Sequence, residues 1–80
     1  MSGVRPLSSH ELVAMLAVYG FLPVLQSGTH HHLLRTENNR LITIPSHPEI
    51  AEGTLAAILR KAAVDPEEFR NLRGQAPSGG

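Results

Sequence analysis

The chain has 80 residues, no cysteine, and seven Lys or Arg balanced by seven Asp or Glu. A chain of this length forms one small domain, and zero net charge excludes a strongly basic protein that holds nucleic acid by charge alone. The lack of cysteine argues against a disulfide-stabilised secreted scaffold, so we expect a cytoplasmic protein. Gly20 and Pro23 interrupt the uncharged stretch 12–34, which argues against a signal peptide or a membrane span.

The first regular element is predicted to be a helix over 9–19, after a flexible lead-in of residues 1–7. Ser8 and Glu11 have the spacing of a capping box, and Leu7 precedes the cap where a hydrophobic staple begins. Apolar residues then recur at helical spacing until a glycine follows as a residue that ends helices. Two independent signals therefore agree on where this helix begins.

Three strands are predicted next, over 22–26, 29–35 and 40–44. Pro23 cannot donate a hydrogen bond to a neighbouring strand, so the first strand is expected at an edge of the sheet. An antiparallel meander is the simplest pairing. Alternation along the second strand predicts two sets of side chains on opposite faces, one with His30, His32 and Leu34 and the other with His31, Leu33 and Arg35.

Two more helices are predicted after the sheet, one beginning near Thr54 and a short one over 66–72. The second of these begins with proline and two acidic residues, which suit the first turn of a helix. Residues 74–80 are expected to be a disordered tail, so the domain is expected to span 8–73. Helices on one face of an antiparallel sheet make a two-layer α+β fold. The helical residues expected in its core include Leu12, Met15, Leu16, Leu55, Ile58, Leu59, Ala62, Phe69 and Leu72.

Six short segments stand in a characteristic order and spacing: Gly20-Phe21, Gly28-Thr29-His30, Leu41-Ile42-Thr43-Ile44-Pro45, His47-Pro48, Gly53-Thr54-Leu55 and Glu67-Glu68-Phe69. Together they resemble the HicA-type toxins of bacterial and archaeal toxin–antitoxin pairs, over nearly all of the chain from Ser8 to Leu72. The resemblance implies a double-stranded-RNA-binding-like α-β-β-β-α fold. It also implies a metal-independent endoribonuclease without a cofactor, with single-stranded mRNA as its substrate and a HicB-type antitoxin as its partner. No direct partnership with DNA or a membrane is expected.

The same resemblance places the catalytic histidine at His30 and the turn glycine at Gly28. RNA carries its own nucleophile, the 2′-hydroxyl, and a neutral imidazole can remove its proton near neutral pH. The backbone amides of Gly28 and Thr29, or the side chains of Arg35 and Arg40, are expected to face the phosphate and to support the transition state or bind the RNA.

Two other interpretations remain open at this point. His30 and His32 are two positions apart on one strand, and with His47 they could hold a zinc ion. Alternatively, a domain of the same fold could bind RNA or a protein partner without catalysis. Sensitivity to a chelator would separate the zinc site from a metal-free ribonuclease.

Overall fold

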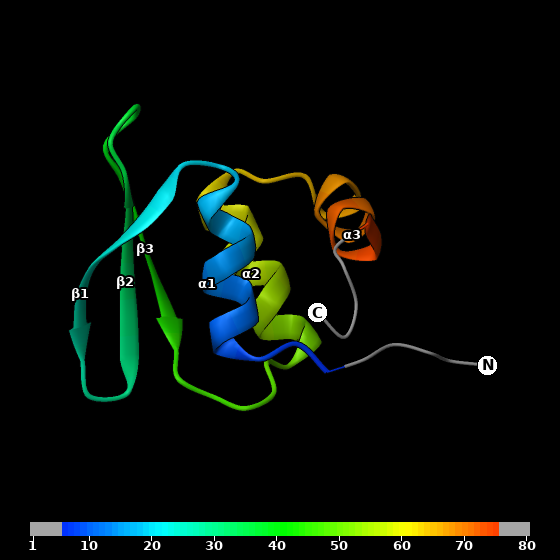
Figure 1. Cartoon of the computed structure of the whole chain (residues 1–80), viewed down its shortest axis with the longest axis horizontal. Coiled ribbons are helices and arrows are strands. Elements are labelled where there is room, and N and C mark those ends of the chain that lie inside the picture. Colours follow the sequence, from blue (N-terminus) through cyan, green and yellow to red (C-terminus); the bar gives the residue numbers. More distant parts are fainter. Residues whose placement is uncertain (1–5, 76–80) are drawn as a thin grey trace.

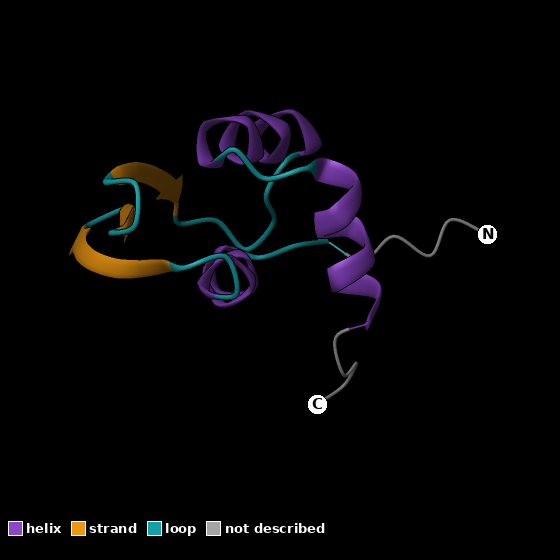
Figure 2. Cartoon of the chain, turned by 90° about the horizontal axis from the view of Figure 1, so that it is seen from above, coloured by secondary structure: helices purple, strands orange, loops and turns teal. Residues whose placement is uncertain are grey.

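A computed structural model describes residues 6–75, which form three helices and one antiparallel sheet of three strands in the order β1-β2-β3. Helices α1 and α2 pack on one face of the sheet, and α3 lies beyond them (Figures 1 and 2). The predicted two-layer α+β fold with its α-β-β-β-α order is confirmed. Its elements are α1 (Ser9–Ala17), β1 (Phe21–Ser27), β2 (His30–Arg35), β3 (Arg40–Pro45), α2 (Glu52–Ala62) and α3 (Pro66–Gln75).

The capping box at the start of α1 is present as predicted. The backbone amide of Glu11 donates to Oγ of Ser8 at 3.1 Å, and the amide of Ser8 donates to Oε1 of Glu11 at 3.1 Å. The helix ends at Ala17, earlier than predicted, because the amides of Val18 to Gly20 each bond the carbonyl three residues back, as in a tighter 3₁₀ turn. Gly20 then adopts a φ of +93°, which reverses the chain into the sheet.

Strand β1 lies at the edge of the sheet, as Pro23 predicted. Its register with β2 shifts between Pro23 and Leu25, so one extra residue is accommodated in a bulge beside the proline. The strand is longer than predicted by one residue at each end, because Phe21 pairs with Arg35 and Ser27 with His30.

The fold extends slightly beyond the predicted domain limits of 8 and 73, to Leu7 at one end and Gln75 at the other. Leu7, expected in the flexible lead-in, is only 3% exposed, and its carbonyl accepts a hydrogen bond from the amide of Ile50 at 2.7 Å. Helix α3 continues through Gly74 to Gln75, where a tail was expected, and Arg73 donates to the carbonyl of Pro6 at 3.1 Å. The rest of the predicted lead-in and tail, residues 1–5 and 76–80, lies outside the described residues.

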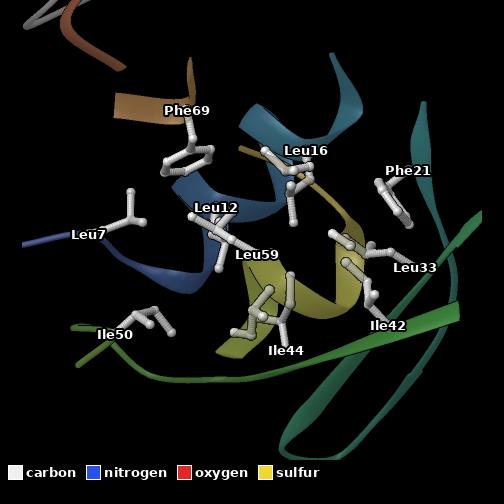
Figure 3. Close-up of a cluster of buried hydrophobic side chains, with 13 residues drawn as sticks. Leu7, Leu12, Leu16, Phe21, Leu33, Ile42, Ile44, Ile50, Leu59 and Phe69 are labelled. Carbon is white, nitrogen blue, oxygen red and sulfur yellow. The ribbon is translucent and has the colours of Figure 1, made fainter. Parts of the chain in front are cut away.

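One cluster of buried side chains joins the sheet to all three helices (Figure 3). Most of the core residues predicted on the helices belong to it, while Met15 and Leu55 are half-buried against it and Leu72 is half-buried. Within residues 6–75, no helix has the length and apolar character needed to cross a membrane. The largest fully buried side chains are Phe21, Leu12, Leu16, Leu33, Ile42 and Ile44.

Candidate active site

A two-residue turn between β1 and β2 presents the histidine singled out in the sequence. Gly28 has a φ of +56° and Thr29 does not have a positive φ, which matches the glycine-first pattern of a type II′ hairpin turn. Ser27 and His30 pair on either side of the turn. The carbonyl of Thr29 accepts a hydrogen bond from the amide of Ser46 at 2.7 Å, which fastens the turn to the end of β3.

His30 is exposed at the first position of β2. Its Nδ1 lies 3.1 Å from Oγ1 of Thr29, while its Nε2 has no hydrogen-bond partner within residues 6–75. The amides of Gly28 and Thr29 likewise donate no hydrogen bond to any other described residue. Nδ1 of His30 is therefore held by a hydrogen bond, whereas Nε2 is unbonded within the described residues. The two residues before His30 carry backbone amides that are also unbonded within residues 6–75.

The other two histidines of the run lie on opposite faces of β2, as the alternation predicted. His31 is half-buried on the face that packs against the helices, and its ring centroid lies 5.9 Å from that of His10 in α1, edge to face. His32 lies on the outer face, with Nε2 at 3.2 Å from Oγ of Ser27 and Nδ1 at 3.2 Å from Oγ1 of Thr43.

The zinc alternative gains no support from this arrangement. Both ring nitrogens of His32 already bond hydroxyl groups. No three His, Asp or Glu side chains of residues 6–75 come together in a group that could hold a metal ion. His47 is an exposed loop residue whose contacts to α1 are made by its backbone.

The structure does not bring Arg35 and Arg40 to the site of His30, where they were expected to face the same phosphate. They pair with each other at the opposite end of the sheet, whereas His30 pairs with Pro45. At about 3.3 Å per strand residue, the five steps from His30 to Arg35 span about 16 Å. Arg35 forms an ion pair with Glu37 at 2.9 Å. Arg40 donates to the carbonyl of Lys61 at 2.9 Å.

The outer face of the sheet changes from polar to apolar along the strands. The row nearest the turn holds Ser27, His30 and Pro45, and the next row holds Leu25, His32 and Thr43. A row of leucines then crosses all three strands, formed by Leu22, Leu34 and Leu41. Sequence reasoning missed the contacts of Ser27 and Thr43 with His32, because their proximity depends on the register of two strand pairs.

Comparison with known proteins agrees with this fold. The family model for the HicA toxins of bacterial toxin–antitoxin pairs matches residues 9–64, which include α1, the whole sheet, the turn with His30, and α2. No curated protein matches the chain. Membership of this family implies an antitoxin as partner. The chain belongs to the HicA toxin family and is the toxin of a toxin–antitoxin pair.

Proposed function

We propose that this toxin is an endoribonuclease that cleaves messenger RNA and that His30 is its general base. The proposal rests on the exposure of the His30 imidazole and on the hydrogen bonding of its two ring nitrogens. His30 is exposed, a hydroxyl group holds its Nδ1, and its Nε2 is open to a substrate. An imidazole held in this way can accept the proton of a 2′-hydroxyl without first breaking a hydrogen bond at the accepting nitrogen.

The surroundings of His30 suit the charge that develops at the phosphate. The amides of Gly28 and Thr29 are unused within the described part of the chain and belong to the two residues directly before His30. Backbone donors that are already in place stabilise a negatively charged oxygen without reorganising during the reaction. General acid–base catalysis contributes about 10²- to 10⁴-fold to a rate, which suffices for a toxin that acts on many messages. No step of this mechanism requires a metal ion.

The substrate of this proposal is single-stranded mRNA, and the site of action is the cytoplasm, which suits a chain without cysteine. Arg35 and Arg40 would bind phosphates of the same strand at a distance from the scissile bond. The antitoxin partner of the toxin would be of the HicB type.

The test compares the wild-type toxin with His30→Ala in an inducible host. We expect the wild type to arrest growth and to cut mRNA, and the variant to do neither while keeping the same unfolding midpoint, because the side chain is exposed. Gln26→Ala is the matched control, since Gln26 is exposed in the same hairpin on the other face of β1.

The purified toxin should also cleave RNA in the presence of EDTA. A His30→Ala protein that remains toxic and cleaves RNA at the wild-type rate would contradict the assignment of the base. Cleavage that stops in EDTA and returns with added metal would contradict the metal-free mechanism.

A further inference from the structure

A chain of hydrogen bonds crosses the outer face of the sheet and joins all three strands. Oγ of Ser27 lies 3.2 Å from Nε2 of His32, and Nδ1 of the same ring lies 3.2 Å from Oγ1 of Thr43. Ser27 ends β1, His32 lies in β2 and Thr43 lies in β3. A hydroxyl group can donate and accept at once, so this chain can pass a proton from the imidazole to the serine.

The serine at one end of this chain is the direct neighbour of His30. Ser27 and His30 are paired residues of β1 and β2. Directly opposed residues of an antiparallel pair have Cβ atoms about 4.5–5.5 Å apart and project to the same face. His32 follows His30 by two positions and therefore lies on that face as well. The hydroxyl of Ser27 and the imidazole of His30 thus stand side by side, both exposed.

Cleavage of RNA through the 2′-hydroxyl needs two proton transfers, and His30 accounts for one of them. When the imidazole takes the proton of the 2′-hydroxyl, a second group must protonate the departing 5′-oxygen. Arg35 and Arg40 are about 16 Å away along the strands, as the rise per residue requires. Ser27 is the side chain that pairs with His30 and is also bonded to a group that can hold a proton.

We propose, on the basis of the ribonuclease function proposed above, that Ser27 is a second catalytic residue. Its hydroxyl protonates the 5′-oxygen of the leaving nucleotide. His32 is a positioning residue that returns a proton to Ser27, and Thr43 orients the imidazole. A nucleophile or proton donor, a histidine and a third group that orients the histidine form a recurrent arrangement in active sites.

The proposed cleavage transfers one proton to His30 and one proton from Ser27. The proton of the 2′-hydroxyl moves to Nε2 of His30, and the 2′-oxygen forms a bond to phosphorus. The bond between phosphorus and the 5′-oxygen breaks, and its electron pair stays on the oxygen, which takes the proton of the Ser27 hydroxyl. Oγ of Ser27 takes the proton on Nε2 of the protonated His32. The products are a 2′,3′-cyclic phosphate and a 5′-hydroxyl, and solvent then resets both imidazoles.

The experiment uses two RNA oligonucleotides that differ in one atom. One is ordinary RNA, and the other carries sulfur in place of the 5′-oxygen at a linkage that the wild-type toxin cleaves. A thiolate leaves without being protonated, so a variant that lacks only the proton donor should cleave the sulfur substrate at the wild-type rate. We expect Ser27→Ala and His32→Gln to lower kcat on ordinary RNA by about 10²-fold or more and to be rescued by sulfur. Thr43→Val should give a smaller loss with the same rescue.

His30→Ala should fail on both substrates, and Gln26→Ala should cleave both at the wild-type rate. If Ser27→Ala loses equal activity on both substrates, or none on ordinary RNA, Ser27 is not the proton donor and this inference is overturned, while the role of His30 stands. If the wild-type toxin cleaves neither substrate, the ribonuclease function fails, and this inference fails with it. Equal unfolding midpoints for all variants exclude misfolding as the cause of any loss.

Discussion

Ser9 and His47 are 38 positions apart and are joined by a compact set of hydrogen bonds. The amide of Ser9 donates to the carbonyl of His47 at 3.0 Å, and the amide of His47 donates to Oγ of Ser9 at 2.6 Å. The same hydroxyl lies 2.6 Å from the carbonyl oxygen of Pro45. Ser9 is only 2% exposed. These bonds fasten the first turn of α1 to the end of β3. This is the end of the sheet that carries His30, because His30 pairs with Pro45.

Replacing Ser9 with alanine should therefore destabilise the fold. The substitution leaves the amide of His47 and the carbonyl of Pro45 without their hydroxyl partner, and an unsatisfied buried polar group costs about 1–3 kcal/mol. Urea denaturation followed by circular dichroism measures the loss. Ser46→Ala is the matched control, because the buried hydroxyl of Ser46 has no hydrogen-bond partner within residues 6–75 and its removal should be nearly neutral. Equal stability of Ser9→Ala and the wild type would contradict this role.

Local chemistry was enough to predict the elements of the fold. The capping box depends on two residues three positions apart, and Pro23 forces an edge strand wherever the strand lies, so neither signal needs tertiary information. Successive side chains of a strand point to opposite faces, so the sequence alone also predicted that His31 and His32 lie on different faces of β2. The start of α2 was placed too late, because its N-cap is Ala51, which makes no side-chain capping bond and carries no signal.

Contacts between residues that are far apart in the sequence could not be predicted from such local signals. Ser9 looked like an ordinary helical residue, and its burial follows from the path of the loop after β3. Arg35 and Arg40 are close to His30 in sequence but far from it in space. An extended strand rises about 3.3 Å per residue, so Arg35 lies at the far end of β2, and Arg40 pairs with it there. The contact of His32 with Thr43 required the register of β2 and β3, and the pairing of His10 with His31 required the packing of α1 on the sheet.

The two faces of β2 should differ sharply in their contribution to stability. Leu33 is fully buried among the helices, whereas its neighbour Leu34 points to the outer face and is only half-buried. We expect Leu33→Ala to lower the free energy of unfolding by about 2–5 kcal/mol, as is usual for a buried leucine. Leu34→Ala should lower it by less than about 1 kcal/mol, since less apolar area is lost from burial. Similar losses for the two variants would contradict this difference between the faces, and a larger loss for Leu34→Ala would show that the strand faces the other way.

The need for glycine at position 28 should come from its positive φ and not from crowding by neighbouring atoms. Gly28 has a φ of +56°, but a Cβ built there would meet no atom within 4 Å. Among residues with a side chain, asparagine tolerates a positive φ best and β-branched residues tolerate it least. Gly28→Val should destabilise the fold by about 1–2 kcal/mol and Gly28→Asn by less. Thermal unfolding of the two variants tests this order, and equal losses for Gly28→Val and Gly28→Asn would contradict it.

Tyr19 should titrate above its ordinary range. It lines a shallow pocket between the turn that follows α1 and helix α3, together with Glu68 and Leu72. Desolvation by burial raises the pKa of Tyr19 above 10.0, and the carboxylates of Glu68 and Asp65 raise it further. Because Tyr19 is the one tyrosine of the chain, the ultraviolet absorbance of tyrosinate reports this group directly. We expect a midpoint above 10.0 in the folded protein and a lower midpoint in Glu68→Gln.

The same shift of the Tyr19 pKa makes stability depend on alkaline pH. Below the pKa of the unfolded tyrosine, about 10, both states keep the proton and stability is unaffected by this group. Between that value and the higher pKa of the folded state, the unfolded chain binds fewer protons, so the free energy of unfolding falls as pH rises. Urea denaturation from pH 9 to 11 should show this fall, after correction for lysine and arginine with the Tyr19→Phe variant, which lacks the group. A fall of the same size in Tyr19→Phe would show that Tyr19 does not cause it.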